Sequence, residues 1–186
     1  MGLRNTTERY GAVAQALHWL IALGFAVQFA LAYYMTGLPL GQFKVEMYNL
    51  HKSIGVTLLG LAVLRLLWRW ANPVPALPAG RPAWEHAASQ ASHAGLYGLI
   101  LLQPLTGLAQ VLYSQFPSVI WGMKLPRIAQ DKAMADAFGT AHFYLQWIVI
   151  ALVAIHAAAA LRHHLVLRDD VLVRMLPGRG QRSQDS

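Results

Sequence analysis

Residues 138–164, FGTAHFYLQWIVIALVAIHAAAALRHH, form an apolar stretch long enough to cross a bilayer as one helix. His142 stands near its start, and His156 follows fourteen positions later. Fourteen residues make nearly four helical turns, so both imidazoles leave the same face, about 21 Å apart along the axis. A histidine inside a membrane usually faces other helices and takes part in a site. The segment therefore predicts two metal centres at different depths. The alternative is two interior histidines hydrogen-bonded across helices.

Composition agrees with a membrane protein. Of the 186 residues, 56% are hydrophobic and only 12% are charged. Because that charged fraction is about half the soluble average, we expect one integral membrane domain covering 1–186. The chain has no cysteine, which excludes disulfides, thiolate-bound iron–sulfur clusters and c-type haem attachment. Histidine remains as the obvious metal ligand.

Four apolar segments of spanning length predict an all-α four-helix bundle, with spans at about 13–36, 46–70, 84–112 and 138–161. The first is too long for a signal peptide and lacks a small-residue cleavage site, so we expect it to be retained. In the second, small residues would admit a neighbouring helix or a flat macrocycle. These are Ser53, Gly55 and Gly60.

The connections carry further expectations. Residues 72–82, NPVPALPAGRP, predict a proline-rich linker. Residues 113–137 predict the longest outer loop, whose apolar side chains would lie on the bilayer or cap the bundle. After the last span, we expect a helix to about Met175 and fraying beyond Pro177.

The net charge of +7 is unevenly distributed. Ten arginines stand at the chain ends or beside spans, on the side expected to hold both termini: Arg4, Arg9, Arg65, Arg69, Arg81, Arg162, Arg168, Arg174, Arg179 and Arg182. The other side carries five basic residues: Lys44, Lys52, Lys124, Arg127 and Lys132. This pattern predicts cytoplasmic termini by the positive-inside rule and argues against binding to nucleic acid.

Depth in the membrane predicts how the histidines pair. His18 and His156 lie near the cytoplasmic ends of their spans, whereas His51 and His142 lie near the outer ends. Each pair would supply two axial nitrogens to a b-type haem held between helices. Zinc would need further ligands nearby, and copper would not need two ligands facing each other across a bundle. Two histidines per iron leave no open position, which favours electron exchange over oxygen binding.

Other polar residues leave alternatives open. His93 lies inside the third span and could replace His86 or His18 in a different arrangement, or hydrogen-bond a haem propionate or a quinone. Arg65 and Arg69 would either pair with propionates or anchor the second span at the membrane surface.

The motifs HW at His18, HKSIG at His51, AH at His142 and IH at His156, on four spans, resemble the bacterial cytochrome b561 family. The resemblance covers nearly the whole chain and is strongest to the small stand-alone, superoxide oxidase-like members. It implies a multi-pass protein of the bacterial inner membrane with two haem b groups, which passes electrons between the periplasmic side and ubiquinone. In superoxide-oxidising members, superoxide donates to the outer haem and quinone is reduced nearer the inner one.

Related membrane anchors of nickel–iron hydrogenases and formate dehydrogenases use a similar bundle to take electrons from a bound partner. A partner-dependent electron-transfer subunit is therefore the second hypothesis. The third is a haem-free membrane protein with structural histidines.

Two further site residues are expected. Lys52 follows His51 directly and would draw an anion such as superoxide toward the outer haem, unless it is an ordinary membrane-flanking charge. The resemblance implies a quinone-site histidine that best matches His163, seven residues after His156 and on nearly the same helix face. The alternative for His163 is an interfacial basic cluster.

Overall fold

The computed structural model describes residues 2–76 and 80–177. Four helices dominate it: α1 (Ala12–Gly37), α2 (Gln42–Trp70), α3 (Ala83–Tyr113) and α4 (Lys132–Leu165). A small hairpin of β1 (Val119–Ile120) and β2 (Met123–Lys124) precedes α4, and a 3-10 turn η1 (Val173–Met175) follows it. All four helices are long and apolar enough to cross a membrane, which confirms the predicted class of fold.

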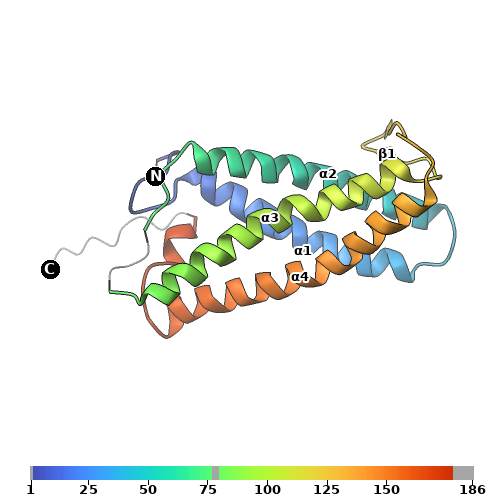
Figure 1. The fold of residues 1–186 in the computed structure, drawn as a ribbon. Helices are drawn as coiled ribbons and strands as arrows, with labels where there is room; N and C mark the ends of the chain where they lie inside the picture. Colours follow the sequence, from blue (N-terminus) through green and yellow to red (C-terminus); the bar gives the residue numbers. More distant parts are fainter. Residues whose placement is uncertain (1, 77–79, 178–186) are drawn as a thin grey trace.

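The helices form one elongated bundle (Figure 1). Helices that are consecutive in sequence pack together: α1 with α2, α2 with α3, and α3 with α4. Within the described residues, α4 makes few backbone contacts, if any, with α1 or α2. The N-terminal segment and the residues after α4 lie at the same end, which we call the terminal end (Figure 1). The α1–α2 connection and the hairpin lie at the opposite end, called the far end.

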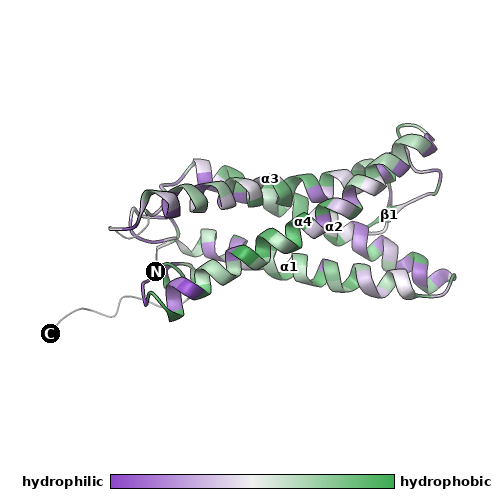
Figure 2. Cartoon of the chain, turned by 60° about the horizontal axis from the view of Figure 1, so that its bottom comes forward, coloured by the Kyte–Doolittle hydropathy of each residue, from purple (hydrophilic) through white to green (hydrophobic). Residues whose placement is uncertain are grey.

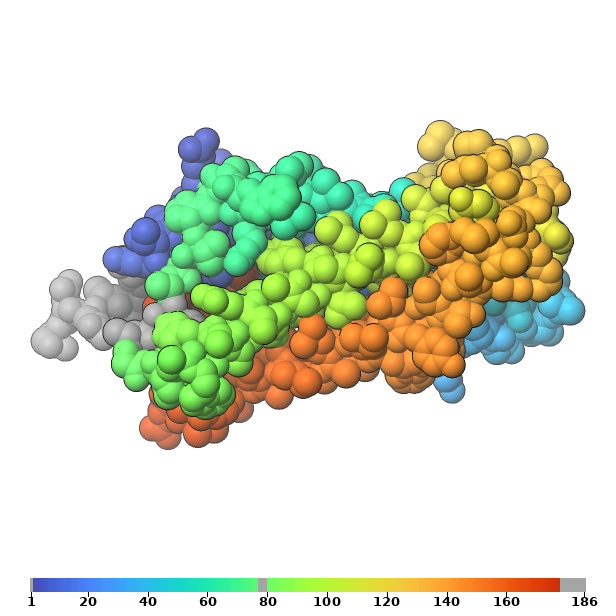
Figure 3. Space-filling model, in the orientation of Figure 1, coloured from blue at the N-terminus to red at the C-terminus, as the bar shows by residue number. Residues whose placement is uncertain are grey.

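Hydropathy follows this arrangement. Hydrophobic residues cover much of the middle of the helices, and hydrophilic residues gather mainly toward the two ends (Figure 2). In Figure 3 the side chains of α3 and α4 lie against each other along the molecule. Large apolar side chains such as Leu23, Leu64 and Ile155 are more than half exposed on the protein itself. An outward-facing apolar surface of this kind is what a bilayer covers.

The helix boundaries have local causes. Asp131 caps α4, because its Oδ1 accepts the backbone N–H of Met134 at 3.1 Å. The cap starts α4 at Lys132, before the expected residue 138, so the outer loop is shorter than predicted. Pro39 follows the end of α1, and Pro104 lies inside α3, which continues through it.

A compact apolar layer closes the middle of the bundle. Every helix contributes to it: Ile21 and Phe25 from α1, Leu58 from α2, Leu99 from α3 and Val149 from α4. Three members stand seven residues from predicted ligands, since Phe25 follows His18, Leu58 follows His51 and Val149 lies midway between His142 and His156. Seven residues are nearly two helical turns, so this layer separates the two histidine depths.

The expected outer loop contains a hairpin that the sequence did not predict. Its turn residues, Trp121 and Gly122, both have positive φ, at 47° and 80°, as a two-residue turn of the mirror-image type requires. The Trp121 backbone N–H donates to Ser53 Oγ, and its indole N–H donates to Thr57 Oγ1, both at 3.0 Å. Ile120 is buried. The loop was expected either to lie on the bilayer or to cap the bundle. Its buried part fits the second expectation.

The prediction of a helix to about Met175 is wrong in part. α4 ends at Leu165, and Arg168 adopts a positive φ of 53° that turns the chain back. The returning segment is held across α1, where the side chain of Gln15 donates to the Arg174 carbonyl at 3.0 Å and Trp19 Nε1 donates to the Met175 carbonyl at 2.9 Å. The residues beyond Pro177, where fraying was expected, are not among those described.

Candidate haem-binding sites and their surroundings

The far-end pair joins α2 to α4. The ring centres of His51 and His142 are 6.2 Å apart and the rings are perpendicular. Their helices do not pack closely against each other along the backbone, so the contact between them at this depth is made by side chains. The structure thus brings this predicted pair together.

The backbone of α3 orients the His142 ring. His142 Nδ1 lies 2.8 Å from the Gln103 carbonyl oxygen, and Thr106 Oγ1 is 3.3 Å from the same nitrogen. A carbonyl only accepts, so the proton sits on Nδ1 and Nε2 keeps its lone pair, with the Gln103 amide 3.5 Å away. A carbonyl that fixes the tautomer in this way is typical of a metal-binding histidine.

Gly107 makes room for the same ring. A Cβ at this position would lie 2.9 Å from His142 Cε1, a distance that side chains do not tolerate without a shift. Opposite, His51 Nδ1 is buried without a hydrogen-bond partner in the described part of the chain. A buried, unpaired imidazole nitrogen is costly unless something binds to the ring.

The terminal-end pair joins α1 to α4. The ring centres of His18 and His156 are 6.3 Å apart. His93 of α3 lies nearer to His156, at 5.5 Å, and its Nδ1 is 3.4 Å from Ser89 Oγ. From the sequence, His93 could replace His18 in a different arrangement. In the structure, the rings of His18, His93 and His156 lie at the same depth.

Distance favours His18 over His93 as the partner of His156. A metal–imidazole bond is about 2 Å long, and the ring centre lies roughly 1 Å farther, so two imidazoles on opposite sides of one metal have centres about 6 Å apart. The 6.2 Å and 6.3 Å pairs meet this condition, whereas the 5.5 Å pair is shorter. Among residues 2–76 and 80–177, no three His, Cys, Asp or Glu side chains gather as a metal site by themselves. Two-histidine sites completed by a macrocycle fit the residues present.

Lys52 follows His51 in α2, and its side chain extends toward Ser118, the residue just before the hairpin. Its Nζ donates to Ser118 Oγ at 2.9 Å and lies 3.5 Å from Asn49 Oδ1. Lys44 is likewise held by a neutral oxygen, the Leu38 carbonyl at 2.8 Å, whereas Lys132 pairs with the carboxylate of Asp136. Lys52 therefore carries a positive charge that neutral oxygens hold beside the far-end pair.

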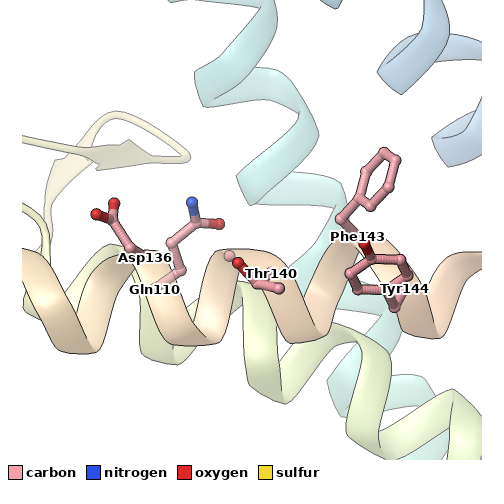
Figure 4. A pocket seen from close by; sticks show the side chains of 6 residues that line it. Gln110, Asp136, Thr140, Phe143 and Tyr144 are labelled. Carbon is pink, nitrogen blue, oxygen red and sulfur yellow. The ribbon is translucent and has the colours of Figure 1, made fainter.

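A hollow of about 400 Å³ also lies at the far end, between α3 and α4. Gln110, Asp136, Thr140, Phe143 and Tyr144 line it (Figure 4). Neither histidine of the far-end pair contributes to its lining, so this hollow is separate from the haem-binding candidate.

His163 occupies the last turn of α4 and has a carboxylate partner. Its Nδ1 lies 2.6 Å from Asp169 Oδ2, and the same oxygen accepts Arg81 Nη2 at 2.6 Å. Burial raises the pKa of Asp169, but hydrogen bonds from His163 and Val171 and the charges of His163 and Arg81 together hold it below its ordinary value. An ionised Asp169 keeps the His163 proton on Nδ1 and leaves Nε2 available.

Sequence reasoning missed Asp169 and the supporting groups of His142. The Asp169 carboxylate reaches His163 only because the chain reverses at Arg168, and nothing in the RDD sequence marks that turn. Gln103 acts through its backbone carbonyl, which no residue type reveals.

Four membrane-length helices and two facing histidine pairs define a membrane bundle of the b-type cytochrome class. Comparison with known proteins identifies the family. Residues 9–178 match the model of the prokaryotic cytochrome b561 family. The chain therefore belongs to this family, which implies haem b as its cofactor, a lipid bilayer as its surroundings and a bacterial membrane as its location.

Individual relatives agree along their whole lengths. The chain is 37% identical to cytochrome b561 homolog 2 of Escherichia coli K12 over 190 residues, covering 100% of this chain and 98% of the relative. It is 28% identical to cytochrome b561 homolog 1 of the same organism, covering 92% and 99%. It is also 27% identical to the probable superoxide oxidase CybB of Yersinia pestis, covering 91% and 97%.

Proposed function

We propose that this protein is a di-haem cytochrome of the bacterial inner membrane, a single membrane domain that oxidises superoxide on the outer side and reduces ubiquinone toward the inner side. The observation that carries the proposal is the pair of facing histidine sets, with ring centres 6.2 Å and 6.3 Å apart, at two depths of one bundle. Similarity to a probable superoxide oxidase supports the choice of substrate.

Four histidines would hold the cofactors: His51 and His142 one haem, His18 and His156 the other. Bound there, the two haems supply one-electron transfer across the bilayer. With two histidines as ligands of each iron, no position would remain open for direct oxygen binding. The Gln103 carbonyl orients the His142 ring, and the central apolar layer keeps water from the space between the two depths.

The terminal end would face the cytoplasm. Ten of the fifteen basic residues belong to this end by sequence, and positive charge is retained on the cytoplasmic side. The far end, with Lys52 beside His51, would then face the periplasm. A cation held by neutral oxygens raises the local concentration of a small anion such as superoxide.

Quinone reduction needs protons as well as electrons. Two superoxide anions would give two electrons and two molecules of dioxygen, and ubiquinone would take up those electrons with two protons. His163 is the proposed hydrogen-bond and proton donor, through Nε2. Asp169 would act as a positioning residue, because its carboxylate holds the His163 ring through Nδ1.

The direct test uses the purified chain alone with superoxide and ubiquinone. We expect superoxide loss coupled to quinol formation in a two-to-one ratio. Lys52→Gln should slow superoxide capture at low salt by up to about tenfold, whereas Lys132→Gln, whose cation is paired with Asp136, should not. If quinone reduction required a co-purifying dehydrogenase or hydrogenase, the protein would instead be an electron-transfer subunit.

A further inference from the structure

A small cavity at the terminal end gathers cations and neutral donors. Arg65, Trp68 and Arg69 of α2, Tyr97 of α3 and Tyr10 before α1 all line it. Both guanidinium groups lie over the Tyr97 ring, 5.6 Å and 5.1 Å from its centre. Arg65 and Arg69 are one helical turn apart on α2, so their positive charges repel each other. A nearby anion would offset this repulsion.

Neither arginine has an acidic partner among the described residues. Three carboxylates at this end are engaged elsewhere: Glu85 with Arg81 and Arg162, Asp169 with Arg81 and His163, and Asp170 with Arg174. Arg65 Nη1 donates to a neutral group, the Ala14 carbonyl, at 3.3 Å. Half-buried charges beside a membrane usually pair. Here, the described protein leaves two cations uncompensated.

The neutral groups add further donors, and the Tyr10 oxygen also accepts a hydrogen bond from Arg69. Trp68 Nε1 is buried with no hydrogen-bond partner in the described part of the chain. Burial raises the pKa of Tyr10 more than the neighbouring Arg69 lowers it, so the phenol keeps its proton. Two guanidiniums, an indole N–H and a phenol O–H together form a donor set that suits a carboxylate.

The cavity adjoins the terminal-end histidines. Ala14, whose carbonyl Arg65 contacts, lies one helical turn before His18. Ala14 also lines the cavity together with Arg65 and Arg69. A ligand bound at this pair would therefore have the two cations beside it.

We infer that Arg65 and Arg69, with the cavity of about 20 Å³ that they line, bind a carboxylate of the haem held by His18 and His156. The inference rests on the proposed function, because it requires a haem at that pair. Haem b carries propionates, and a carboxylate of one of them would supply the anion that the two guanidiniums lack among the described residues. A lipid phosphate at the membrane surface shares the same anionic chemistry, and the experiment below separates the two sources.

The test compares Arg65→Gln, Arg69→Gln and their double variant with Arg162→Gln, an arginine of the same end that is already paired with Glu85. The readouts are haem content, haem retention during washing and the midpoint potential of each haem. We expect one potential to become more negative, because a nearby cation stabilises the reduced state, and that haem to dissociate at least about tenfold faster. The second haem and Arg162→Gln should be unaffected.

Milder variants keep the test decisive if the double variant does not fold. Arg69→Lys should recover part of the potential, and Tyr10→Phe should cause a smaller shift in the same direction. Two haems with unmoved potentials in both glutamine variants would overturn this inference alone. So would native mass spectrometry that shows loss of a bound phospholipid with unchanged haem. A wild-type chain lacking the terminal-end haem would overturn the proposed function as well.

Discussion

Single residues determine the orientation of the histidine rings. His142 is the clearest case, since the Gln103 carbonyl holds Nδ1 at 2.8 Å and Gly107 leaves space for the ring. The sequence predicts which histidines face each other, because depth along a helix can be counted from residue numbers. It cannot predict a backbone carbonyl as partner, since that depends on the register between α3 and α4.

Gly107→Ala should weaken the far-end site alone. The added Cβ would approach His142 Cε1 to 2.9 Å, and the ring cannot turn away without losing its bond to Gln103. Overpacking of this kind costs about 1–3 kcal/mol, so we expect partial loss of one haem in visible spectra. Gly98→Ala is the matched control, because nothing lies within 4 Å of its added Cβ. Equal haem loss in both variants would contradict this explanation.

We predict opposite effects on haem content for substitutions of His18 and of His93 at the terminal end. His18→Ala should remove one of two haems, because its ring stands 6.3 Å from His156, the separation expected across a metal. His93→Ala should keep both, because its ring lies beside His156 at 5.5 Å. Haem counts per purified chain distinguish them. Retention of both haems in His18→Ala with loss of one in His93→Ala would reverse the assignment.

At the scale of elements, the helices could be predicted and the connections could not. Hydropathy and length locate a membrane helix directly, so each helix contains one expected span. The hairpin has strands of only two residues, and its stability comes from Ser53 and Thr57, more than sixty residues earlier in the chain. The segment after α4 likewise depends on its distant contacts with α1. Local sequence carries no signal for such docking.

The segment after α4 should respond to acid through Asp169. The pKa of Asp169 in the folded protein is below its ordinary value of 3.8. The carboxylate therefore stabilises the fold fully above pH 3.8, and this stabilisation is lost as the pH falls through the pKa of the folded protein. We expect thermal stability of the wild type to fall in this range more steeply than that of Asp169→Asn, which lacks the ion pair with Arg81 at all pH values.

Asp136→Asn is the control for this titration, because its carboxylate pairs with Lys132 at an exposed surface of the far end. It should follow the wild type. Parallel acid profiles of Asp169→Asn and the wild type would show that Asp169 does not hold the segment. The same variants can be assayed for the pH profile of quinone reduction, where only Asp169→Asn should change.

At the scale of the whole molecule, the bundle places two equivalent sites on either side of one apolar layer. α4 supplies a histidine to each, while α1 and α2 supply one partner apiece. The spacing of fourteen residues on α4 already predicts two depths, and the charge distribution predicts an orientation. Both pairs join helices that do not pack closely along their backbones.

The central claim is that each histidine pair holds one haem b. Haem content per purified chain, with an oxidised-minus-reduced visible spectrum, tests it most directly. We predict two low-spin b-type haems per polypeptide, falling to one in His51→Ala and in His18→Ala. A single haem in the wild type, or two haems retained after His51→Ala, would contradict it.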